Sequence, residues 1–147
     1  MIRTFEQIIE LLAALKPEDF DDLIPEELFT LTDELKALPN PERGVPALFD
    51  LMERLSGSDL GCPGPIVHTL ESMQGQYETE LCESLRRKPT PLSVWMVNRI
   101  LNACRNPVER NAYLAVLQSA AEHPEASTEA REDALHFIEL QSDRATD

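Results

Sequence analysis

The chain has 147 residues, of which 42% are hydrophobic, and a formal net charge of −14. A chain of this length and apolar content can bury a core without a metal ion or a disulfide bond. Its negative charge argues against direct binding to nucleic acid or to an anionic membrane, because Lys and Arg supply the affinity for both. We therefore predict one domain over residues 1–147, with a polar, frayed tail at 142–147.

The first segment has the pattern of an amphipathic helix. Thr4 and Gln7 have the spacing of a capping box, and apolar residues then recur at helical intervals. Pro17 ends this helix, because the residue before a proline avoids the α region. The acidic stretch at 17–24 is predicted to form a short turn or a single helical turn.

Two further helices follow, each with a proline near its first position. Pro25 begins the second helix, and Pro46 begins the third after a break at 39–41. A Gly-rich loop is predicted at 56–65. The expected buried stripe of the second helix consists of Leu28, Leu31, Thr32, Leu35 and Leu38.

Helices four to six are predicted at about 65–73, from residue 77, and from Pro91. Thr90 supplies a capping hydroxyl directly before Pro91, which suits the first helical position. Because the sixth helix is apolar around most of its circumference, we place it at the centre of the core, with Trp95 buried. Asn98 on the same helix is expected to be buried and to bond to free backbone groups at a neighbouring helix end.

The last two helices are predicted from similar signals. Asn106 and Pro107 begin the seventh, and Ser127 or Thr128 caps the eighth. No segment of useful length alternates with period two, and the eight predicted helix starts fall 12 to 21 residues apart. These spacings predict an all-α fold of about eight short helices as stacked antiparallel helical hairpins, a short HEAT-like solenoid. An irregular helical bundle remains an alternative.

The sequence contains no familiar catalytic or cofactor motif. Phosphate-binding glycine loops, zinc-protease helices and nucleophile elbows are all absent. Cys62, Cys82, Cys104 and His68 lack the paired spacing of zinc ligands, so we predict no metal site and free core thiols. The absence of these motifs predicts a protein without a cofactor. The absence of a signal peptide and of a long apolar run predicts that it is cytoplasmic.

The strongest local feature is an acidic run between residues 18 and 27. Close carboxylates repel one another and are most stable when exposed to solvent. They could serve only as a solvated, helix-capping face, or they could form a docking patch for the Lys and Arg residues of a partner. The predicted protein-binding residues are Glu18, Asp19, Asp21, Asp22, Glu26 and Glu27.

Three strings carry a family resemblance: LGCPGPIVHTLE (60–71), PTPLSVWMVNRILN (89–102) and ERNAYLAVLQSAAEHP (109–124). Through them, about a third of the chain resembles the small acidic all-helical immunity proteins of bacterial contact-dependent inhibition and polymorphic toxin systems. The resemblance implies a protein that binds the C-terminal toxin domain of a cognate effector, often a basic nuclease, and blocks it without turnover.

The sequence therefore leaves three classes of function open. The first is an immunity protein that neutralises a basic bacterial toxin domain in a stoichiometric complex. The second is a helical adaptor or regulatory subunit that binds another basic protein. The third is an enzyme with an unfamiliar site, which would need a pocket that gathers His68, Glu71 and a cysteine.

Overall fold

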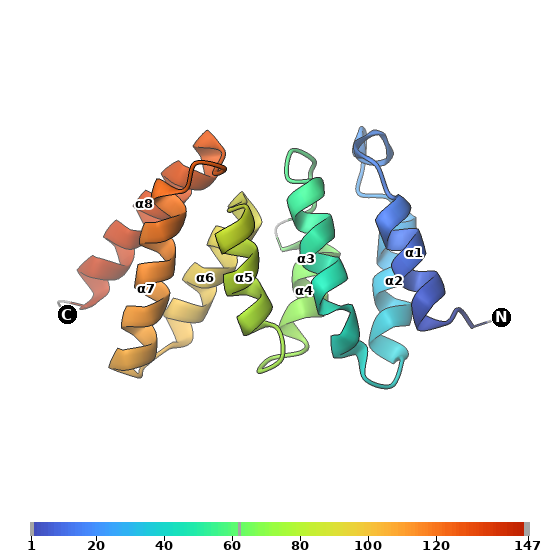
Figure 1. Cartoon of the computed structure of the whole chain (residues 1–147), viewed down its shortest axis with the longest axis horizontal. Coiled ribbons are helices and arrows are strands. Elements are labelled where there is room, and N and C mark those ends of the chain that lie inside the picture. Colours follow the sequence, from blue (N-terminus) through green and yellow to red (C-terminus); the bar gives the residue numbers. More distant parts are fainter. Residues whose placement is uncertain (1, 62, 146–147) are drawn as a thin grey trace. The chain divides into compact units, whose positions relative to one another are not determined.

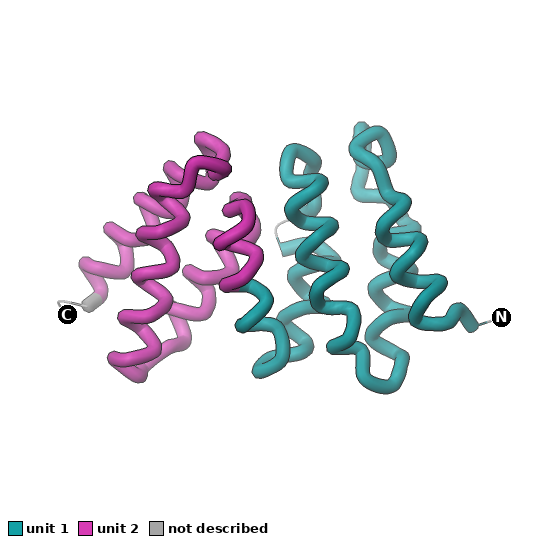
Figure 2. Tube along the Cα trace, in the orientation of Figure 1, with its two compact units in different colours: residues 1–81 teal, residues 82–147 magenta. Residues whose placement is uncertain are grey.

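A computed structural model describes residues 2–61 and 63–145, and over these residues the chain is all-α (Figure 1). It contains eight α-helices, two short 3₁₀ helices and no strand within that described part, and the helices pack in adjacent antiparallel pairs. The predicted fold class is confirmed. The backbone contacts group into two compact units, residues 1–81 (unit 1) and residues 82–147 (unit 2) (Figure 2). The prediction of a single domain stays a prediction, and each unit is described by itself.

Unit 1 is built from two helical hairpins. Helices α1 and α2 form the first hairpin, and α1 also packs on α3 while α2 packs on α4 (Figure 1). The 3₁₀ helices lie in the connections that follow α1 and α2. The bounds are α1 Phe5–Ala14, η1 Pro17–Phe20, α2 Glu26–Ala37, η2 Pro41–Gly44, α3 Val45–Arg54 and α4 Gly64–Glu71.

The start of α1 is the predicted capping box. The Gln7 amide donates to Thr4 Oγ1 at 3.2 Å, and the Thr4 amide donates to Gln7 Oε1 at 2.9 Å. The other end of α1 is capped from α3, because the Arg54 guanidinium donates to the Leu12 and Leu15 carbonyls at 3.2 and 2.9 Å. Both ends of the helix thus have partners for backbone groups that the helix itself leaves unpaired.

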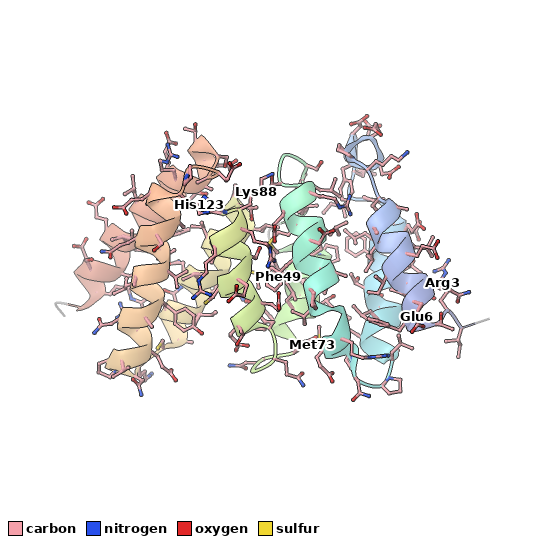
Figure 3. The ribbon with its side chains drawn as sticks, viewed as in Figure 1. Arg3, Glu6, Phe49, Met73, Lys88 and His123 are labelled. Carbon is pink, nitrogen blue, oxygen red and sulfur yellow. The ribbon has the colours of Figure 1, made fainter. Side chains whose placement is uncertain are left out.

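The core of unit 1 is apolar and closely packed. Phe49 on α3 is fully buried (Figure 3). Gly44, just before α3, lies so close to α2 that a Cβ atom there would be 2.7 Å from Leu35 Cδ2. Of the predicted α2 stripe, all but the half-buried Leu38 are buried. The main buried residues are Ile8, Leu12, Leu28, Leu31, Leu35, Leu48, Phe49, Leu51, Met52, Ile66 and Leu70.

Unit 2 contains most of α5 and the last three helices. The boundary between the units falls within α5, and α8 packs against both α6 and α7. Thr90 caps α6 as predicted, and Ser127, rather than Thr128, caps α8 by accepting from the Ala130 amide at 3.1 Å. The bounds are α5 Glu78–Arg87, α6 Pro91–Ala103, α7 Pro107–Glu122 and α8 Thr128–Ala145. Since α8 continues to Ala145, most of the predicted tail is helical; residues 146–147 lie outside the described residues.

A polar bracket (Asn98, Asn102, Arg110 and Gln141) joins the three last helices. The fully buried Gln141 of α8 donates from Nε2 to Asn98 Oδ1 at 2.7 Å and to Asn102 Oδ1 at 2.8 Å, both on α6. Arg110 of α7 donates to Gln141 Oε1 at 2.9 Å and to the Gln141 carbonyl at 3.0 Å. Asn98 is buried as predicted, but its partner is a side chain and not the backbone of a helix end.

The burial of the α6 side chains corrects the prediction that Trp95 is buried. Val94, Met96 and Val97 are buried, whereas Trp95 is only half-buried. The Arg99 guanidinium lies over the Trp95 ring, 4.8 Å from its centroid, so one face of the indole meets a cation rather than the core. An apolar sequence around a helix did not reveal which side meets the neighbouring helices.

His123 connects the end of α7 to the end of α5. Its Nδ1 accepts from the Glu125 amide at 2.9 Å, and its Nε2 lies 2.6 Å from the Arg86 carbonyl oxygen. A carbonyl can only accept, so Nε2 carries the proton and the ring is neutral in this arrangement. Figure 3 labels His123 by this end of α5.

Candidate protein-binding site

The connection between α1 and α2 is an acidic turn that a buried side chain anchors to the core of unit 1. Phe20, in the middle of the acidic residues, is only 5% exposed and anchors the turn to the core of unit 1. The Lys16 amide donates to Asp19 Oδ2 at 2.9 Å, which fixes the start of the 3₁₀ helix. Ile24 is half-buried and packs against Gly61. The turn therefore has a defined backbone, with residues between the anchors directed to solvent.

All six predicted binding residues are exposed. Glu18 and Asp19 lie in the 3₁₀ helix, and Glu26 and Glu27 lie in the first turn of α2. A helix N-terminus favours negative charge there, because its free amides carry a partial positive charge. Within residues 2–61 and 63–145, none of the six carboxylates takes part in an ion pair. Their charge is therefore directed to solvent and is not compensated by a neighbouring Lys or Arg at contact distance.

The two units differ sharply in charge. Residues 1–81 contain 17 acidic and 5 basic side chains, a net charge of −12. Residues 82–147 contain 10 acidic and 8 basic side chains, a net charge of −2. Almost the whole negative charge of the chain thus belongs to the unit that contains the acidic turn.

Two apolar residues lie among these carboxylates and were missed by the sequence reasoning. Leu23 is 79% exposed, and Phe29 is 45% exposed. Phe29 follows Glu26 and precedes Asp33 by about one turn each, so the three share the outward side of α2. The outward position of Phe29 could be predicted from the sequence, because Phe29 falls outside the apolar stripe of α2. The pattern of charged residues alone does not indicate it.

The residues considered for metal binding or catalysis do not gather in one place. His68 is exposed on α4, and Cys82 and Cys104 are half-buried rather than core residues. Cys62 lies outside the described residues. Over the part of the chain that is described, no group of three or more His, Cys, Asp or Glu side chains could hold a metal ion. Nor does any described helix have the length and apolarity needed to cross a membrane.

Comparison with known proteins gives no family for this chain. No protein-family model matches it, and neither a curated protein nor a solved structure does. The resemblance to immunity proteins therefore stays a prediction.

Proposed function

We propose that this chain is an immunity protein, which binds a basic bacterial toxin domain and neutralises it in a stoichiometric complex. The contact surface is the acidic face formed by the turn at 17–24 and the first turns of α2. The single observation that supports the proposal is the set of six exposed carboxylates without ion-pair partners in a unit of net charge −12.

Such a surface favours a basic protein partner for electrostatic reasons. Opposed potentials steer two proteins together and raise the association rate, and they discourage partners of the same sign. Neutralisation by this route needs only a complex that covers the partner, so it needs neither a cofactor nor a catalytic group. A face that serves solubility alone would give no specific, salt-dependent association.

The direct test starts from the native host. The tagged full-length chain is purified with its bound proteins, and one basic domain is expected at equal stoichiometry. That domain, expressed alone, should stop growth, and co-expression of this chain should restore growth. A basic partner without toxicity would reassign the chain as an adaptor or regulatory subunit. Recovery of no basic partner would remove the proposal.

A further inference from the structure

We propose that Leu23 and Phe29 are the apolar anchors of the acidic face, and that its occupant is a basic protein segment. That segment would carry apolar side chains between Lys and Arg residues. Its apolar side chains would contact Leu23 and Phe29, and its Lys and Arg residues would pair with the carboxylates of the face. The inference deepens the proposed function and rests on it for the identity of the natural partner.

Exposed apolar side chains are common on protein surfaces, so their setting must distinguish these two. The other large exposed apolar residues of the described chain are Ile2, Val108, Leu135 and Leu140. None of these lies within the acidic run at 18–27, whereas Leu23 lies inside it and Phe29 lies two residues beyond its end. An apolar centre with a charged rim is the arrangement in which interface residues contribute most to affinity.

The two anchors are close enough to act in one interface. Leu23 and Glu26 are three residues apart, and Phe29 lies one helical turn further on. The chain geometry therefore keeps the two Cα atoms within roughly 15 Å of each other. A standard interface buries about 800 Å² on each partner, which is a patch roughly 25–30 Å across. Both anchors and the carboxylates around them fit inside such a patch.

The local structure holds Leu23 outward instead of leaving it in a loose loop. Phe20, three residues before it, is buried, and Ile24, directly after it, packs against Gly61. Phe29 is fixed by its place on α2, whose opposite side is buried through Leu28 and Leu31. Side chains that are already held in place lose less conformational entropy on binding, so they suit an anchoring role.

The chemistry of the face selects one occupant. A nucleic acid or an anionic membrane would bring negative charge against the carboxylates. A second copy of this unit would oppose −12 with −12. A protein segment that carries Lys or Arg around apolar side chains compensates the charge and covers Leu23 and Phe29 in the same contact.

Two synthetic peptides of equal length and equal lysine content provide the probe. In one peptide Lys alternates with Leu, and in the other each Leu is replaced by Ser. Full-length protein is titrated with each peptide at physiological ionic strength. The Lys/Leu peptide should bind about ten-fold more tightly, and the double variant Leu23→Ser, Phe29→Ser should bring the two affinities within about two-fold.

The matched control is Val108→Ser. Val108 is 79% exposed, as Leu23 is, but it lies between Arg105 and Arg110 in sequence. This variant should keep the full preference for the Lys/Leu peptide. Circular dichroism should show unchanged helix content in every variant, since all the replaced side chains reach solvent.

Several results would overturn the inference. Equal binding of both peptides to the wild-type chain would do so, as would an equal loss of preference in the Val108 variant. Concentration-dependent dimerisation that Leu23→Ser abolishes would assign the face to a second copy.

The inference and the proposed function can fail separately. If the anchor variant still neutralises the natural partner with unchanged affinity, the anchors are wrong and the immunity function stands. If the peptides show the expected preference but the partner is not toxic, the anchors stand and the immunity function falls.

Discussion

The two units use similar helices but satisfy their buried polar groups in different ways. In unit 1, the hydroxyls of the buried Thr32 and Thr69 donate to carbonyls one turn earlier on their own helices, at 3.0 and 2.7 Å. In unit 2, the Thr90 and Ser93 hydroxyls also bond locally, but the fully buried Gln141 bonds across to other helices. The buried side chains of unit 1 therefore join its helices by apolar packing, and its directional link between helices comes from the part-buried Arg54, which donates from α3 to the end of α1. In unit 2, by contrast, a directional link lies inside the core and positions α8.

The largest expected effect is therefore in the apolar core of unit 1. Phe49→Ala should lower the free energy of unfolding by about 3–5 kcal/mol, because it removes a fully buried ring and leaves a cavity. Phe29→Ala makes the same chemical change on the outward side of α2 and should cost well under half as much. Urea unfolding followed by circular dichroism measures both, and similar losses would contradict the assignment of Phe29 to the surface.

The next effect tests the polar bracket of unit 2. Gln141→Ala should cost about 2–3 kcal/mol, because the buried Asn98 loses its donor, whereas the exposed Asn102 keeps a bond from Arg144. Thr32→Val in unit 1 should cost less than about 1 kcal/mol, since the Leu28 carbonyl keeps its helical partner. Denaturant unfolding of both variants provides the measurement. Similar losses in the free energy of unfolding for Gln141→Ala and Thr32→Val would contradict the proposed difference between the two units.

Charge reversal should separate binding from stability. Lysine at Asp21, Asp22, Glu26 and Glu27 should slow association with the basic partner steeply and flatten its salt dependence, because exposed charges act on encounter over a Debye length of about 8 Å. Asp19 is left unchanged because it caps the turn. Stopped-flow mixing at several ionic strengths provides the measurement. The same reversal at Glu122, Glu125, Glu129 and Glu132 should slow association far less; equal slowing would move the interface to unit 2.

The smallest effect concerns a carboxyl on α8. Burial raises the pKa of Asp133 above its ordinary value, His136 partly offsets this, and Glu132 adds to it. The folded chain then holds this proton more tightly than the unfolded chain, so the stabilising contribution is present in acid and is lost as pH rises past the raised pKa. Asp133→Asn should slightly raise the melting temperature at neutral pH relative to wild type and leave little difference in acid. A lower melting temperature at neutral pH would contradict this.

Local signals in the sequence predicted the parts of the fold that are decided locally. The Thr4 and Thr90 caps and most of the buried stripe of α2 follow from neighbouring residues alone, and the exposure of the acidic run follows from mutual repulsion. The place of Trp95 and the bond between Asn98 and Gln141 depend on how distant helices meet, which periodicity does not encode. Leu23 was missed because its exposure depends on which residues beside it are anchored.

The cap that Arg54 places on the end of α1 has a consequence for the order of folding. Its two acceptors, the carbonyls of Leu12 and Leu15, are 42 and 39 residues away along the chain. The last turn of α1 closes locally through the bond from the Leu15 amide to the Leu12 carbonyl, but the Arg54 cap can be added only when α3 has docked. During synthesis, a nascent chain that has not yet exposed Arg54 would therefore carry α1 without this second set of partners, directly before the acidic turn. The end of α1 would gain them only when the second hairpin of unit 1 has formed.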